Sequence, residues 1–72
     1  RKMRERAVLQ RCRQGDRLIS DVVAAISPDI TPELVEAAAL SVLAHLEHLI
    51  GRELVAAEGT SELLSAFYVR VS

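Results

Sequence analysis

The sequence predicts a small, mostly helical α+β domain in which helices come first and a β-hairpin comes last. Two segments, 1–14 and 31–52, carry apolar residues at helical spacing, and the C-terminal residues alternate between apolar and polar. The chain has 72 residues, half of them apolar, which suits one domain with one core. We therefore treat residues 1–72 as a single domain.

The segment from Thr31 to Arg52 is predicted to be the central helix. Thr31 can act as the N-cap, because its hydroxyl can accept a hydrogen bond from the first turn. Pro32 suits the first helical position, and Gly51 is expected to end the helix in a left-handed conformation. At about 100° per residue, roughly half of the helix is apolar and should face the core. That half contains Leu34, Val35, Ala38, Ala39, Val42, Leu43, Leu46, Leu49 and Ile50.

The segments before this helix read as a helix, a short link and a second helix. Residues 1–14 form the first helix, with Met3, Ala7, Val8 and Cys12 on its apolar stripe, and Gly15-Asp16 ends it. Residues 17–19 form a short extended link, read as one short strand. Ser20 is expected to cap a helix over 21–26, which the turn 27–29 follows.

The C-terminal residues are predicted to form the hairpin. One strand spans 54–57, a turn follows at 58–61, and a second strand spans 63–71. Phe67, Val69 and Val71 should share one face of that strand, with Tyr68 and Arg70 on the other. The predicted order is therefore helix, short strand, helix, long helix and β-hairpin, which is the winged-helix arrangement.

Composition narrows the class of protein. The single cysteine excludes an intrachain disulfide and suits a reducing compartment. No apolar run of membrane-spanning length and no signal peptide are recognised, so a cytoplasmic protein without membrane contact is expected. Because the chain begins with arginine, we expect it to be part of a longer protein.

Positive charge is concentrated near the N-terminus. Seven of the nine basic residues lie in residues 1–17, which carry a net charge of +5, whereas the rest of the chain carries −6. One interpretation is a weak, sequence-independent contact with nucleic-acid phosphates. The arginines that would make it are Arg4, Arg6, Arg11 and Arg13. We favour the other interpretation, a solvated helix, because no aromatic residues interleave with the arginines to stack on bases.

Two stretches of the chain resemble a known family. The run from Ile26 to Leu34, with Asp29 and Pro32 in the turn, leads into Ala38 and the run Ser41–Leu46 with Leu49. This pattern resembles the C-terminal winged-helix domain of metallo-β-lactamase-fold hydrolases. In that family the first helix often opens with Arg-Glu, which matches Arg4-Glu5. The chain departs from the pattern at Glu47-His48, where a basic residue is usual, and at Ile50-Gly51, where an acidic residue usually precedes the glycine.

The resemblance implies a parent enzyme whose catalytic domain precedes this one. Such enzymes use a His-x-His-x-Asp-His motif, usually with two zinc ions, to activate water for hydrolysis. That motif is absent from these 72 residues. The chain itself is therefore expected to be non-catalytic and to hold no cofactor, with zinc implied only for the parent.

Three side chains of the long helix and one cysteine are candidate chemical groups. His45, Glu47 and His48 with Cys12 could suggest a metal site, but ligands must converge, and His48 and Glu47 are expected to diverge outward. His45 is expected to be a packed histidine at the edge of the core. Cys12 lies on an apolar stripe and is expected to be a small buried hydrophobe, not a nucleophile.

The outer face of the long helix carries an apolar strip formed by Ala37, Leu40 and Ala44. Small residues one turn from a leucine let another surface approach closely, so this strip is predicted to be a docking face. The favoured hypothesis is an accessory domain that docks on the parent catalytic domain and shapes substrate access. The alternatives are a stand-alone DNA-binding regulator and a dimerising interaction module. The acidic residues of this face, Glu33, Glu36 and Glu47, would repel DNA phosphates and so count against the regulator.

Overall fold

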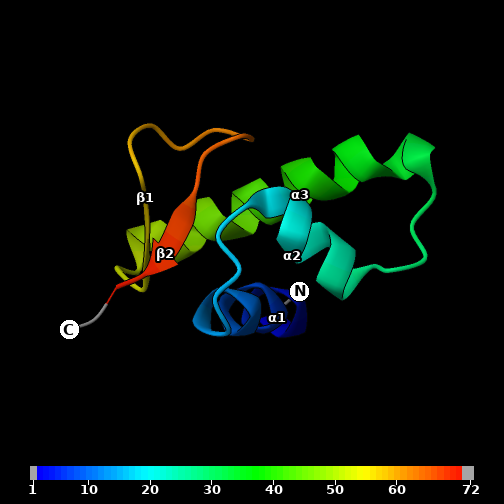
Figure 1. Cartoon of the computed structure of the whole chain (residues 1–72). Helices are drawn as coiled ribbons and strands as arrows, with labels where there is room; N and C mark the ends of the chain where they lie inside the picture. Colours follow the sequence, from blue (N-terminus) through cyan, green and yellow to red (C-terminus); the bar gives the residue numbers. More distant parts are fainter. Residues whose placement is uncertain (1, 71–72) are drawn as a thin grey trace.

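The computed structural model describes the backbone of residues 2–70 and the side chains of residues 4–70. Met3 and Val71, which the sequence places on apolar faces, lie outside the described side chains. The elements follow the predicted order, three helices and then an antiparallel hairpin (Figure 1). They are α1 Lys2–Arg13, α2 Ile19–Ile26, α3 Pro32–Gly51, β1 Val55–Ala57 and β2 Phe67–Val69.

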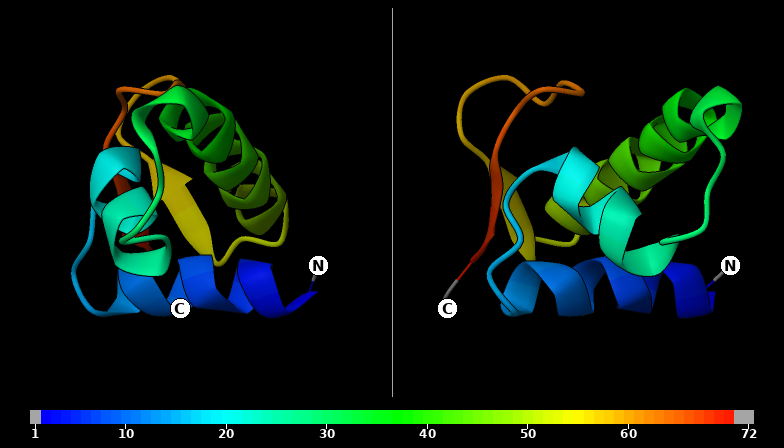
Figure 2. Two further views of the ribbon diagram at one scale, coloured as in Figure 1. Left: turned by 90° about the vertical axis from the view of Figure 1, so that its right-hand side faces the viewer. Right: turned by 45° about the vertical axis from the view of Figure 1, so that its right-hand side comes forward.

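The core forms where the three helices and the hairpin meet. Helix α1 lies below α2 and α3, and the hairpin packs against the C-terminal end of α3 (Figures 1 and 2). The core is aliphatic apart from one aromatic ring, that of Phe67, as the composition requires. Its buried residues are Val8, Cys12, Ile19, Val22, Val23, Val42, Leu46, Leu49, Val55 and Phe67.

The hairpin is shorter than predicted. Strands β1 and β2 pair in the register Val55 to Val69 and Ala57 to Phe67. The prediction of a strand from residue 63 is wrong, because residues 63–64 belong to a turn. The Ser65 hydroxyl holds this turn by accepting a hydrogen bond from the Glu62 N–H at 3.1 Å. The predicted short strand at residues 17–19 is reduced to one bridge between Leu18 and Ala66.

Helices α1 and α3 end in the same way but with different residues. In α1 the left-handed residue is Gly15, which lies where the sequence predicts the end of the helix. In α3 the prediction of Gly51 is wrong, since that residue stays helical and Glu53 takes the left-handed conformation with φ of 63°. The Glu53 N–H donates to the Ile50 carbonyl at 2.9 Å, and the Leu54 N–H donates to the Leu49 carbonyl at 3.0 Å. These two bonds define a Schellman motif.

The predicted N-caps are only partly correct. Thr31 occupies the N-cap position of α3, but its side chain makes no capping hydrogen bond. Ser20 is not a cap, because α2 already begins at Ile19 and Leu18 is the N-cap residue.

Helix α3 buries one side of its C-terminal half and leaves its N-terminal turns exposed. Val42, Leu46 and Leu49 belong to the core, whereas Leu34 and Val35 are 56% and 42% exposed. The prediction that Leu34 and Val35 face the core is therefore wrong. The reason is visible in Figure 2, where the first turns of α3 lie far from α1 and at the opposite end from the hairpin.

By length and composition, α3 is apolar enough to cross a membrane, so the prediction that no apolar run reaches membrane-spanning length is wrong. The criterion is weak evidence for a span, because core helices of globular domains also meet it. Here Val42, Leu46 and Leu49 contribute to a shared core with the other elements.

Candidate functional site

A groove of about 850 Å³ runs between α1 and the C-terminal half of α3. Both apolar side chains and side chains that can carry charge line it. The lining residues are Glu5, Arg6, Leu9, Ala44, His45, His48, Leu49 and Arg52. The groove therefore joins two segments that are far apart in the sequence.

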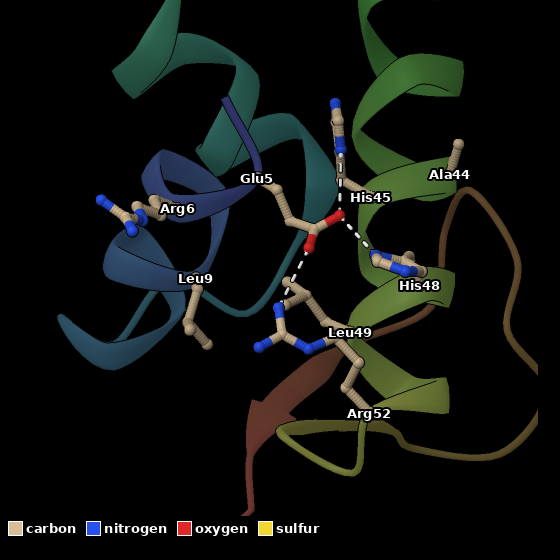
Figure 3. A pocket seen from close by; sticks show the side chains of 8 residues that line it. All are labelled: Glu5, Arg6, Leu9, Ala44, His45, His48, Leu49 and Arg52. Carbon is tan, nitrogen blue, oxygen red and sulfur yellow. Dashed lines mark hydrogen bonds and ion pairs between the residues drawn. The ribbon is translucent and has the colours of Figure 1, made fainter. Parts of the chain in front are cut away.

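The carboxylate of Glu5 contacts three side chains from the C-terminal part of α3 and its C-cap (Figure 3). Its Oε1 lies 2.7 Å from Nδ1 of His48 and 3.6 Å from Nδ1 of His45. Its Oε2 accepts a hydrogen bond of 3.3 Å from Nη1 of Arg52. We call Glu5, His45, His48 and Arg52 the Glu5 cluster.

Helical spacing explains why the three α3 side chains reach one carboxylate. His45, His48 and Arg52 are separated by three and four positions, so they lie along one side of the helix. Glu5 lies in the first turn of α1, where the helix dipole favours a negative charge. The cluster thus links the beginning of α1 to the end of α3.

The neighbours of Glu5 favour its ionised form. The hydrogen bond from His48 is the largest cause that lowers the pKa of Glu5 below its ordinary value. Partial burial opposes this shift, while His45 and Arg52 lower the pKa further. The Glu5 carboxylate is therefore the negative centre of the groove.

The outer face of α3 carries the predicted strip. Ala37, Leu40 and Ala44 are all exposed, and half of the Leu40 surface is accessible. Glu33, Glu36 and Glu47 are exposed on the same face. Ala44 also lines the groove, so the strip runs into the groove.

The family model for the beta-lactamase associated winged helix domain matches residues 19–62, more than half of the chain. The chain belongs to this family. The match spans α2, α3 and β1, which confirms the winged-helix fold and the association with β-lactamase-fold proteins expected from the sequence. No curated protein and no solved structure shows a significant match to the chain.

In this winged helix domain the two histidines behave differently from one another. His45 is largely buried, with 16% of its side chain exposed, at the edge of the core as predicted. The prediction that His48 diverges outward is wrong, because its ring turns back to Glu5 although 65% of the side chain is exposed. The i, i+3, i+7 spacing of His45, His48 and Arg52 indicates that these side chains share one side of α3. No local pattern in the sequence indicates that Glu5, 43 positions from His48, is their partner.

The residues described by the structure do not fit a metal site. Among residues 2–70, no group of three or more His, Cys, Asp or Glu side chains has the arrangement that a metal ion needs. In the Glu5 cluster the second carboxylate oxygen is already occupied by a guanidinium.

The arginines of α1 fall into two groups. Arg4, Arg6 and Arg13 are exposed, and no ion pair involving them is found in the described part of the chain. Arg11 instead donates from Nε to the Asp16 carboxylate at 2.8 Å and also contacts Gln14. Of the four predicted phosphate contacts, Arg11 is therefore held within the domain.

Cys12 is packed inside the winged helix domain. It is 7% exposed, and burial raises the pKa of its thiol. A neutral, inaccessible thiol is a poor nucleophile, which agrees with the predicted role as a small buried hydrophobe.

Proposed function

We propose that this winged helix domain is a non-catalytic accessory domain of a metal-dependent, β-lactamase-fold hydrolase. It docks on the catalytic domain through Ala37, Leu40 and Ala44 and helps to shape substrate access. The observation that carries the proposal is this exposed strip on the longest helix of a domain whose family is associated with β-lactamases. An exposed apolar strip on a small domain is a common mark of an interaction surface.

The charge of α3 favours docking over the reading of DNA. In a winged-helix regulator the recognition helix enters the major groove and lies close to phosphates. Here the outer face of α3 presents Glu33, Glu36 and Glu47, which phosphates repel. We therefore expect only weak nucleic-acid binding, through Arg4, Arg6 and Arg13, that disappears as salt is raised in a filter-binding titration.

The proposal places the metal chemistry outside this domain. Because no described group of residues suits a metal, the zinc implied for the parent is assigned to the catalytic domain, which would use it to activate water. A cytoplasmic location belongs to the same proposal and is supported by the unpaired cysteine.

The test uses the full-length polypeptide that contains this domain. Leu40→Glu places a charge in the strip and should increase the rate of proteolytic cleavage between the domains, since that rate follows the undocked population. Leu64→Glu is the matched control, because Leu64 is 93% exposed on the hairpin loop and should leave cleavage unchanged.

Three results would contradict the proposal. The first is a full-length sequence that encodes no metal-ligand motif and no β-lactamase-fold domain. The second is an unchanged cleavage rate in a folded Leu40→Glu variant. The third is a variant that only converts a dimer to a monomer in sedimentation, which would support the dimerising module instead.

A further inference from the structure

Helix α1 is held to the rest of the domain by two different kinds of contact. Its second half is anchored in the core, where Val8 is 0% and Cys12 is 7% exposed. In its first turns Arg4 and Arg6 are exposed, and the Glu5 carboxylate reaches across to α3 and its C-cap (Figure 3). We infer that the Glu5 cluster is a pH-sensitive clasp, which strengthens the contact between the first turns of α1 and α3 as the pH falls from about 7.5 to about 5.5. Every group in the clasp belongs to this domain, so the inference does not depend on the proposed function.

The hydrogen bond between His48 and Glu5 determines where the additional proton binds. An ionised carboxylate can only accept hydrogen bonds, so Nδ1 of His48, which lies 2.7 Å from Oε1 of Glu5, carries the donated hydrogen. Nε2 is then the ring nitrogen that takes up a proton, and 65% of the side chain is open to water. Protonation therefore keeps this hydrogen bond and places opposite charges at its two ends, which makes it stronger.

The other charged groups that face Glu5 come from the same two helices and the C-cap of α3. Nδ1 of His45 lies 3.6 Å from Oε1, and Nη1 of Arg52 lies 3.3 Å from Oε2. On α1 itself, Arg6 lines the same groove. Within residues 4–70, helix α2 and the hairpin add no charged side chain to the groove lining. Glu5 is therefore the one carboxylate among several nitrogen bases in this lining.

Only the imidazoles change their charge in the proposed pH range. The hydrogen bond from His48 is the main cause that lowers the pKa of Glu5, so the carboxylate stays ionised, and a guanidinium stays protonated. Imidazoles gain a positive charge between about pH 8 and pH 5. Because proton uptake and the closed clasp favour each other, linkage makes the contact stronger as the pH falls through this range. His48 accounts for most of the response, since it lies closer to Glu5 than His45 does.

The experiment measures backbone hydrogen exchange by NMR in the 72-residue chain. The protection factor compares each amide with its intrinsic exchange rate at the same pH, so it reports how often the helix opens. For the amides of Ala7 and Val8, the protection factor should be about threefold higher at about pH 5.5 than at about pH 7.5. This is the effect expected of one partly exposed ion pair.

Three variants separate a titrating clasp from a contact that is only structural. His48→Gln keeps a side-chain donor on an exposed position but cannot be protonated, so it should lose most of the pH response. Arg52→Gln should lower protection at both pH values and keep the response, because the guanidinium charge is constant. Arg13→Gln is the matched control, exposed on α1 outside the Glu5 cluster, and should behave as the wild type does.

Two results would overturn the clasp. One is a wild-type protection factor that is the same at both pH values. The other is a pH response of the same size in the His48→Gln variant, which would show that the titrating group lies elsewhere.

Discussion

The two halves of α3 have similar apolar compositions but different environments. In the C-terminal half, Val42, Leu46 and Leu49 are buried against α1, α2 and the hairpin, and polar neighbours meet Glu5. In the N-terminal half, Leu34 and Val35 are largely accessible. The comparison shows that an apolar arc predicts which side of a helix can face a core. Whether a residue on that side is buried depends on whether another element packs against it. One half stabilises the fold, and the other remains available to a partner.

The largest effect is expected in the buried half. Leu46→Ala removes a side chain that is 1% exposed and should lower the free energy of unfolding by about 2–5 kcal/mol. The same change at Leu40, in the same helix, should cost less than about 1 kcal/mol, because half of that residue is already in water. Chemical denaturation of both variants measures the difference. Equal losses would show that the two halves of α3 do not differ.

The Glu5 cluster should make the buried half sensitive to acid. Because the folded-state pKa of Glu5 is lowered, its contribution is fully present above the unfolded pKa of about 4.3 and is lost as pH falls through the folded value. Glu5→Gln should cost about 1 kcal/mol near neutral pH, the scale of a partly exposed ion-pair network. The difference between wild type and variant should shrink below about pH 4.3. A difference that stays constant through this range would exclude the lowered pKa.

The C-terminal end of α3 offers a stabilising pair of changes. Gly51 is helical and an added methyl group would meet no atom within 4 Å, so Gly51→Ala should stabilise by about 0.5–1 kcal/mol. Glu53→Gly should stabilise by about 1 kcal/mol, because glycine adopts the left-handed conformation without strain. Thermal unfolding measures both. Gly15→Ala is the control, and its φ of 108° means that the same change should destabilise α1.

The sequence predicted the elements well because their signals are local. Gly15 and Pro32 mark helix ends, and the spacing of Val42, Leu46 and Leu49 identifies the core side of α3. Other features required the three-dimensional arrangement. Nothing near His48 in the sequence indicates Glu5, and the exposure of Val35 follows from the end of the packed region, not from its position on the helical wheel.

Residue preferences at helix ends also do not predict the left-handed conformation of Glu53. Glycine is the common residue at that position, and Gly51 lies only two positions earlier. The choice depends on where α3 must stop for Leu54 to pack against the core and for β1 to begin at Val55. Tertiary packing therefore overrides the local glycine signal at this helix end.

The smallest effect on stability is expected for Val35→Ala, and comparing it with Val42→Ala contrasts the two halves of α3 most directly. Val35 and Val42 are seven positions apart on one face of α3, yet they are 42% and 5% exposed. Val42→Ala should destabilise by about 1–2 kcal/mol, since it removes buried methyl groups. Val35→Ala should have no cost or a gain of a few tenths of a kcal/mol, about the advantage of alanine over valine in a helix.

The pair of valine variants also tests whether the exposed half is covered in the longer protein. In the 72-residue chain, thermal unfolding should respond to Val42→Ala only. In the longer polypeptide expected from the proposed function, Val35→Ala should weaken the contact between domains if the first turns of α3 are part of the proposed docking surface. A loss of stability in the isolated chain equal to that of Val42→Ala would mean that the first turns of α3 pack inside this domain. The contrast between the two halves of the helix would then disappear.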